Sequence, residues 1–326
     1  MLPTFRVRAG ARLHLGQLDL NGSLGRLYGG IGLAVDKPGL ALEAQPADKI
    51  RIEAPEPERQ RAERLARCYL EHYRLPGALI CITESLPVHN GLGSGTQLAL
   101  AIGLAITKLY GLRPSLQELA AITDREGSRS GLGVAAFKQG GFVVDGGKLS
   151  AASVSASARS GFFVPPVIAR FSFPQEWRIV LATPRSLEKM SGSKEEAAFK
   201  SLPAMGEQIS GKISRLVLMR LLPALAEKDL KAFGQAVAAI QEYLGDYFAP
   251  VQGGRFATNE GARVAELLLS WGAVGVGQSS WGPTVYGFIK REKADELVEA
   301  VRTYVGDKGT VWGARGVNHG ARWGWN

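Results

Sequence analysis

The sequence has few of the features that mark secreted, membrane-embedded or metal-stapled proteins. Its 326 residues include two cysteines, Cys68 and Cys81, without a CxxC pattern, which excludes a disulfide-stapled fold. The longest apolar run, Leu98 to Ile106, is nine residues, whereas a membrane span needs about 20. The N-terminus lacks the apolar segment of a signal peptide. We therefore expect a protein of the reducing cytoplasm, with no membrane partner.

Histidine and clustered positive charge are also scarce. The four histidines have no metal-ligand spacing, so a zinc site is not expected. Lysine and arginine outnumber aspartate and glutamate by 39 to 30, a formal charge of +9, yet no basic run exceeds two residues. This scatter disfavours nucleic acid and suits a phosphorylated small molecule. A basic surface without a specific partner is the open alternative.

Glycine, by contrast, is abundant. The chain has 41 glycines, about 13% against a typical 7%. They cluster at 22–32, 91–95, 127–147, 272–287 and 306–324. Clustered glycines between apolar segments indicate turns and close backbone approach to a ligand. With 45% apolar and 21% charged residues, the chain has the composition of a folded protein rather than a disordered one.

Strand and helix patterns alternate irregularly, which favours an α+β fold over a doubly wound sheet. The small, polar stretch 150–161 predicts a boundary near 150–170, giving domains 1–160 and 161–326. We expect a loop over Gly16–Gly30 and a helix cap at Ser115. The patterns predict strands at 4–9, 31–45, 78–83, 141–145, 167–171, 178–182, 273–277 and 283–289, and helices at 58–73, 96–110, 115–125, within 195–245, and at 259–271 and 292–304.

The most informative motif is the segment from Pro87 to Gln97, PVHNGLGSGTQ, between a strand and an apolar helix. Its glycines let backbone N–H groups turn inward, and the helix N-terminus adds partial positive charge. The motif lacks the lysine of a Walker A loop. We predict that it binds phosphate through Gly91, Leu92, Gly93, Ser94, Gly95 and Thr96; a capped glycine loop without a ligand is the alternative.

A second glycine-rich segment, residues 12–32, follows the first predicted strand and carries two arginines, a histidine and an acid. Arginines suit bidentate contacts with phosphate or carboxylate, and the acid can face a metal or a developing cation. The alternative is a turn in which Asp19 and Asn21 bond their own backbone. The candidate residues are Arg12, His14, Asp19, Asn21, Arg26, Gly29 and Gly30.

Two further segments complete the candidate site. Glu126 offers a carboxylate to Mg²⁺ on a phosphate group, and Arg129 and Ser130 follow it as candidate substrate contacts. The loop Gly275–Thr284 lies between two predicted strands, and its glycines and hydroxyls suggest a second wall of the cleft, with a strand bulge as the alternative. Its candidate substrate contacts are Gly277, Ser279 and Ser280.

In these motifs the chain resembles the GHMP kinase superfamily, which includes galactokinase, homoserine kinase and mevalonate kinase. The segment 87–96 resembles the superfamily's PxxxGLGSSA phosphate motif, and Gly275 to Gly282 resembles its C-terminal glycine motif. Glu126 falls where homoserine-kinase-like members carry a Mg²⁺-binding glutamate. The resemblance covers nearly the whole chain and implies a two-domain GHMP-like fold, Mg²⁺ as cofactor, with Glu126 and Ser94 as its ligands, and a homodimer.

The chain departs from the kinases at one position. Many members carry an aspartate that acts as base for the accepting hydroxyl, and the matching residue here is Gly133. Phosphoryl transfer to a hydroxyl usually benefits from such a base. Homoserine-kinase-like members lack it as well, so a kinase stays open as the alternative activity.

Two long segments, Ala11–Val35 and Arg129–Gly147, resemble the β-ribofuranosylaminobenzene 5′-phosphate synthase branch of the superfamily. The resemblance implies a decarboxylating phosphoribosyl transferase of methanopterin biosynthesis, which condenses 4-aminobenzoate with phosphoribosyl pyrophosphate and releases CO2 and pyrophosphate. That reaction needs no hydroxyl base. The resemblance also implies catalytic roles for His14, Asp19 and Arg26, and contacts with the anionic groups of the substrates for Arg12 and Arg129. 4-Hydroxybenzoate stays open as the arene, and a non-catalytic binding protein is a further alternative.

Overall fold

The computed structural model describes residues 3–123, 131–150, 164–185 and 201–326, and in them the chain forms two sheets. The first sheet has eight strands in the order β12-β1-β2-β4-β3, with β5 and β6 paired to β2, and β7 paired to β5. These strands are β1 (Phe5–Asp19), β2 (Arg26–Pro46), β3 (Arg51–Glu53), β4 (Ala78–Glu84), β5 (Phe142–Asp145), β6 (Lys148–Leu149), β7 (Val167–Phe171) and β12 (Arg322–Trp325).

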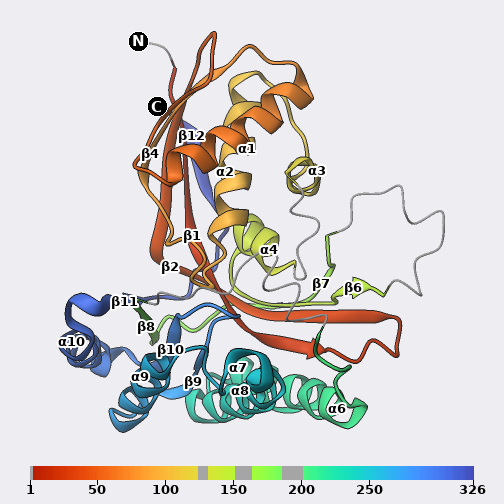
Figure 1. The fold of residues 1–326 in the computed structure, drawn as a ribbon, viewed down its shortest axis with the longest axis vertical. Coiled ribbons are helices and arrows are strands. Elements are labelled where there is room, and N and C mark those ends of the chain that lie inside the picture. Colours follow the sequence, from red (N-terminus) through yellow and green to blue (C-terminus); the bar gives the residue numbers. More distant parts are fainter. Residues whose placement is uncertain (1–2, 124–130, 151–163, 186–200) are drawn as a thin grey trace.

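The second sheet is antiparallel, with four strands in the order β11-β8-β10-β9. Figure 1 shows this sheet and its helices below the first sheet, whose helices α1 to α4 lie along one face. The strands are β8 (Trp177–Pro184), β9 (Val274–Gln278), β10 (Val285–Lys290) and β11 (Gly309–Ala314).

The helices divide between the two sheets. The first sheet carries α1 (Glu58–Tyr73), α2 (Ser94–Leu109), α3 (Leu116–Ile122) and α4 (Leu132–Gln139). The part of the chain that forms the second sheet also forms the remaining helices. These are α6 (Glu207–Leu216), the π-helix η3 (Val217–Leu221), α7 (Leu222–Glu227), α8 (Leu230–Gln252), α9 (Asn259–Ser270), η4 (Arg291–Lys293), α10 (Ala294–Val305) and η5 (Gly306–Lys308). The mixture confirms the predicted α+β class.

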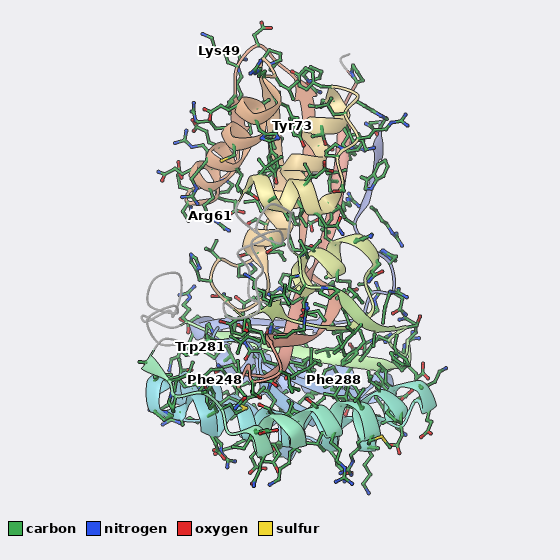
Figure 2. The ribbon with its side chains drawn as sticks, turned by 90° about the vertical axis from the view of Figure 1, so that its right-hand side faces the viewer. Lys49, Arg61, Tyr73, Phe248, Trp281 and Phe288 are labelled. Carbon is green, nitrogen blue, oxygen red and sulfur yellow. The ribbon has the colours of Figure 1, made fainter. Side chains whose placement is uncertain are left out.

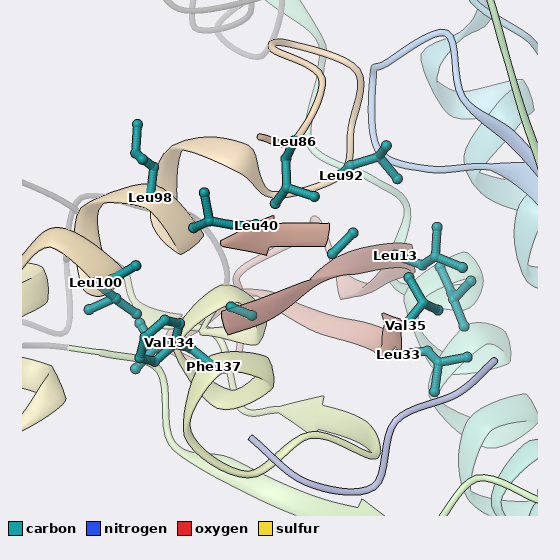
Figure 3. Packing of buried hydrophobic residues seen from close by; sticks show 14 of the residues in the cluster. Leu13, Leu33, Val35, Leu40, Leu86, Leu92, Leu98, Leu100, Val134 and Phe137 are labelled. Carbon is teal, nitrogen blue, oxygen red and sulfur yellow. The ribbon is translucent and has the colours of Figure 1, made fainter. Parts of the chain in front are cut away.

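The main apolar cluster lies between the first sheet and its helices and continues into the second sheet, through residues such as Phe233 of α8 and Phe288 of β10. A smaller cluster packs the second sheet against α9 and α10. At its start β1 alternates buried apolar residues with exposed ones, so that one face of the strand packs inward. The helix α2 is apolar on all sides, and it is correspondingly buried over most of its length. Figure 3 shows Leu13, Leu33 and Val35 of the hairpin in the cluster that also contains Leu100 of α2 and Phe137 of α4. This core holds both ends of the loop that precedes α2.

The predicted loop over Gly16–Gly30 is wrong. The chain stays in strand conformation to Asp19 and re-enters it at Arg26, so β1 and β2 form one long hairpin. The register shifts between His14 and Gly16, where a β-carbon on residue 16 would lie 2.7 Å from Leu244 Cδ1. The glycine therefore permits a bulge against α8 rather than a loop, and glycine content alone does not separate these two cases.

Several predicted elements are confirmed. The helix at 58–73 and the strand at 167–171 have the predicted bounds, and Ser115 caps α3 in a capping box with Glu118. At the C-terminal end, Trp323 and Trp325 contact Phe5, with ring centroids 5.8 and 5.1 Å apart. The division at residue 160 stays a prediction. Among the described residues no helix is long and apolar enough to cross a bilayer.

Candidate functional site

The predicted phosphate loop, residues 87–96, connects β4 to α2. Gly91 and Gly93 both have φ of +76°, in the left-handed region that favours glycine, and Gly93 is the N-cap of α2. Ser94 is 8% exposed and Thr96 is half-buried, and within the described parts of the chain neither hydroxyl has a hydrogen-bond partner. The loop therefore offers two hydroxyls and the N–H groups of a 16-residue helix to an anion.

The loop between β9 and β10, residues 279–284, touches the phosphate loop through Ser279. Its hydroxyl donates a hydrogen bond to the carbonyl of Gly91 (2.7 Å) and accepts one from the backbone N–H of His14 (3.0 Å). The side chain is fully buried. Ser279 was predicted to contact substrate; the structure places its hydroxyl against two backbone groups, and a contact with substrate remains a prediction.

Thr284 makes the second contact between these loops. Its hydroxyl donates to the carbonyl of Asn90 (2.6 Å), so its neighbour Thr183 must donate to it across 2.7 Å. Both threonines are buried. With Ser279, this arrangement holds two carbonyls of the phosphate loop, those of Gly91 and Asn90, against hydroxyls from the 279–284 loop.

The two loops meet with their backbones in contact. A β-carbon on Gly91 would lie 2.0 Å from the carbonyl oxygen of Ser279, and one on Gly282 would lie 2.3 Å from the nitrogen of Gly91. Neither position has room for a side chain, because backbone atoms cannot rotate away. The glycines of both motifs therefore serve the contact between the two parts of the chain as well as the shape of the loop.

Arg12 lies along the phosphate loop. Its backbone N–H donates to the carbonyl of Leu92 (3.1 Å), and its Nη1 donates to the carbonyl of Gly91 (3.4 Å). A β-carbon on Gly93 would lie 3.5 Å from Arg12 Nε. This places a guanidinium beside the N-terminus of α2, where both groups attract an anion.

His14, two residues further along β1, is 6% exposed. Burial, and secondly the neighbouring Arg12 guanidinium, lower the pKa of its imidazole from 6.5 to about 3. The ring is therefore neutral at physiological pH and does not add positive charge. It lines a small cavity with Gln241, Phe248 and Trp281. Figure 2 shows the last two side by side where the two sheets meet.

The shifted pKa of His14 makes stability pH-dependent. The unfolded chain binds a proton below about 6.5 and the folded chain only near 3, so unfolding becomes easier as pH falls through this window. We expect the free energy of unfolding to drop by up to about 1.4 kcal/mol per pH unit there. Denaturant titrations from pH 7 to 4 measure this, and H14Q is expected to flatten the slope. An equal slope in H14Q would refute the assignment.

Asp19, Asn21 and Arg26 lie at the far end of the hairpin. Asp19 Oδ1 accepts from the backbone N–H groups of Asn21 (2.6 Å) and Gly22 (3.0 Å), which is the turn given above as the alternative interpretation. Arg26 donates to the carbonyls of Gly146 (2.6 Å) and Gly147 (2.8 Å). The catalytic roles of Asp19 and Arg26, and the substrate contact of Asn21, stay predictions.

The remaining glycine and serine candidates lie in tightly packed backbone. Gly30 pairs with Gln17 across the hairpin, and a β-carbon on Gly29 would lie 3.0 Å from Leu18 Cδ1. One on Gly277 would lie 2.5 Å from Gln241 Cγ. Ser280 donates its N–H to the carbonyl of His14 (3.3 Å). Their proposed contacts with substrate remain predictions.

Sequence reasoning missed two polar residues that hold the site, the partly buried Gln241 and the buried Asp145. Gln241 of α8 donates to the carbonyl of Leu15 (2.7 Å) and accepts from the N–H of Gln278 (2.8 Å), so it ties β1 to β9. Asp145 accepts from the N–H groups of Gly131 (2.8 Å) and Gly147 (2.9 Å). Gln241 has no signal in the sequence, whereas Asp145 ends a predicted strand before two glycines.

Gly133, the position of the kinase aspartate, is blocked. A β-carbon there would lie 2.9 Å from Thr96 Cγ2 and 3.0 Å from Thr96 Cβ. Gln97 fixes the same position, because its Nε2 donates to the carbonyl of Gly133 (2.8 Å). Accommodating an aspartate would require Thr96 or the start of α4 to move.

The metal prediction falls partly outside the described residues. Glu126, Arg129 and Ser130 lie in the undescribed stretch 124–130. In the described ranges no cluster of three histidine, cysteine or acidic side chains is placed to hold a metal. The Ser94 hydroxyl is a suitable oxygen donor. Of the two predicted metal ligands, the structure therefore describes Ser94 alone, and its oxygen fits Mg²⁺.

Comparison with family models supports the fold. The model of the GHMP kinases N-terminal domain matches residues 60–141, and the GHMP kinases C-terminal model matches residues 221–307. The crystal structure of L. major mevalonate kinase in complex with R-mevalonate is similar, with a TM-score of 0.70 and 13% identity, covering 97% of this chain and 96% of that one. At this identity the likeness shows the fold alone.

Two archaeal relatives are more similar in sequence. The chain is 35% identical over 322 residues to the β-ribofuranosylphenol 5′-phosphate synthase of Methanothermobacter thermautotrophicus, covering 95% of this chain and 96% of the relative. It is 38% identical over 309 residues to the protein of the same name in Archaeoglobus fulgidus, covering 93% of each.

Proposed function

Since the chain belongs to the β-ribofuranosylphenol 5′-phosphate synthase family within the GHMP kinase fold, we propose that it is this synthase of methanopterin biosynthesis. The substrates are phosphoribosyl pyrophosphate and a benzoate with an electron donor in the para position. The products are the ribofuranosyl arene 5′-phosphate, CO2 and pyrophosphate. The observation that carries the proposal over a kinase is the identity of 35% and 38% to relatives named as this synthase, over more than nine-tenths of the chain. The crowding of Gly133 by Thr96, at the position of the hydroxyl base in many kinases, agrees with it.

The reaction suits a site without that base. The bond from ribose C1 to pyrophosphate breaks, and its electron pair leaves with pyrophosphate. The ring carbon that bears the carboxylate supplies the pair for the new C–C bond. Loss of CO2 then returns a pair to the ring and restores aromaticity. No hydroxyl is deprotonated, so the chain must hold the leaving group and align the two carbons.

The described residues can hold the leaving group. The N–H groups at the start of α2, the hydroxyls of Ser94 and Thr96, and the Arg12 guanidinium all lie beside the phosphate loop. We propose that they bind pyrophosphate and stabilise the charge that develops on it as the bond breaks. His14 is neutral at neutral pH, so in this scheme it positions substrate rather than supplying charge.

We propose Mg²⁺ as cofactor, bound to pyrophosphate and to Ser94 and Glu126. When bound, the cation neutralises phosphate charge. Arg26 and Arg129 are proposed for the 5-phosphate and the carboxylate, whereas Arg12, which the sequence also offered for these groups, is proposed for pyrophosphate because it lies along the phosphate loop. A homodimer in the reducing cytoplasm completes the proposal, and free thiols at Cys68 and Cys81 suit that compartment.

The donor on the arene distinguishes two forms of the proposal. The relatives are named for a phenol product, which corresponds to 4-hydroxybenzoate, whereas the sequence resemblance pointed to 4-aminobenzoate. Both donors raise electron density on the carbon that carries the carboxylate. We propose that the site uses such a donor, and the assay below compares the two.

The test is release of labelled CO2. Pure protein is incubated with Mg²⁺, phosphoribosyl pyrophosphate and carboxyl-labelled 4-hydroxybenzoate or 4-aminobenzoate. We expect release that requires both substrates and that stops when a chelator removes Mg²⁺. No release with either arene would refute the synthase, and product formation that depends on ATP with a hydroxyl acceptor would replace it with a kinase. Release that persists with chelator would refute only the Mg²⁺ requirement.

A further inference from the structure

Strand β12 forms one edge of the first sheet, and no other described strand pairs with its outer side. The end strand β12 pairs on one side with β1, and Asn326 donates its N–H to the carbonyl of Thr4 (2.9 Å). Hydrogen bonding alternates along an antiparallel pair, so the N–H and C=O groups of Trp323 and Trp325 point away from β1. An unpaired edge of this kind is a template for another strand.

The two tryptophans on this edge are also half exposed. Each is 53% accessible, although both contact the buried ring of Phe5. Beside Trp323 lies a groove of about 270 Å³ between the sheet edge and the helices. Its apolar lining includes Leu104, Leu112, Leu116 and Phe137, and its basic lining is Lys108, Arg113 and Lys138. Lys108 Nζ lies 4.9 Å from the Trp323 ring centroid.

The opposite face of the same edge is basic. Arg322 lies directly across from Arg8, so both side chains share the face away from the tryptophans, and both are exposed. Within the described ranges neither forms an ion pair with a carboxylate. A cleft on this face is lined by Arg8, Arg322 and two acids. Of these acids, Asp36 is paired with Arg315 (2.8 Å), and Glu84 forms no ion pair with any described residue.

These two faces define the partner. A strand added to β12 would place alternate side chains beside the tryptophans and the apolar groove, and the others beside Arg322, with the long Arg8 side chain one strand further in. We propose that the outer edge of β12 is a docking site for an extended segment of a partner protein in which apolar and acidic residues alternate. A second copy of β12 fits less well, because it would bring Arg322 against the same basic face of a chain with charge +9.

A nine-residue peptide of alternating glutamate and valine, labelled with fluorescein, provides the direct test with the full chain. We expect binding in the micromolar range that weakens with salt, and slower hydrogen exchange at the amides of Trp323 and Trp325. A lysine–valine peptide, and the glutamate–valine peptide with a central proline, are expected not to bind. Binding without protection of those two amides would overturn strand addition, and so would equal binding of the control peptides.

Charge-reversal variants test the faces separately. We expect R8E and R322E each to weaken binding by about tenfold or more, with the melting temperature and synthase activity unchanged. The matched control is R64E, an exposed arginine on α1, which is expected to leave binding unchanged. Equal binding by all three variants would overturn the proposal. A free protein that sediments as a dimer with both tryptophan amides already protected would also overturn it, because a second copy would then occupy the edge.

Discussion

Replacing Gly91 with alanine is expected to lower kcat/KM of the synthase by at least about 100-fold, because the new β-carbon would lie 2.0 Å from the Ser279 carbonyl oxygen. The phosphate loop and the 279–284 loop would have to separate. A displacement near 1 Å in a site that works by alignment costs about this factor. Steady-state kinetics with both substrates, together with the melting temperature, measure the effect.

Gly111→Ala is the matched control for this prediction. Gly111 has φ of +71°, close to the +76° of Gly91, but a β-carbon added there would meet no atom within 4 Å. Its alanine variant is therefore expected to lose only the 1–2 kcal/mol or so of left-handed strain, with activity retained. If G91A kept activity as G111A does, the backbone contact between the loops would not matter for catalysis.

Thr284→Val is expected to raise KM for phosphoribosyl pyrophosphate about tenfold while KM for the arene changes little. The valine removes the hydroxyl that binds the Asn90 carbonyl and leaves that carbonyl and the Thr183 hydroxyl unsatisfied. Each such buried group costs about 1–3 kcal/mol. The released Asn90 carbonyl belongs to the loop proposed to bind pyrophosphate, so the loss is expected to fall on phosphoribosyl pyrophosphate and not on the arene.

The conservative variant separates this role from packing. Thr284→Ser keeps the hydroxyl and removes one methyl group, so it is expected to lose stability but to retain a KM for phosphoribosyl pyrophosphate near that of the parent. Equal increases in both KM values for T284V, or equal behaviour of T284S and T284V, would contradict a specific effect on the phosphate loop.

Local patterns predicted the elements whose signals are local. The bounds of α1 followed from side-chain periodicity and the cap of α3 from Ser115, and the structure adds Glu118 to that cap. The phosphate loop was visible because glycines, hydroxyls and a helix start fall within ten residues. The hairpin at 16–30 was not, because its glycines permit either a loop or a bulge, and the choice depends on Leu244, far along the chain.

The contacts that shape the site were beyond sequence reasoning for a similar reason. The bond from Thr284 to Asn90 joins residues 194 positions apart, and no pattern in either segment specifies the other. The predicted contact residues Arg12 and Ser279 did come together at the phosphate loop. The predicted metal carboxylate, Glu126, lies outside the described residues, so its place in the site is not tested.

The pairing of β12 with β1 has a consequence for how the chain matures during translation. Arg6 and Asn326 are hydrogen-bonded across 320 positions, so β1 leaves the ribosome long before the strand that pairs with its outer edge. At 5–20 residues per second that delay is roughly 15–60 s. During it the Phe5–Arg8 edge has no neighbour, and chaperones that cover nascent strands have their longest opportunity to act at this edge.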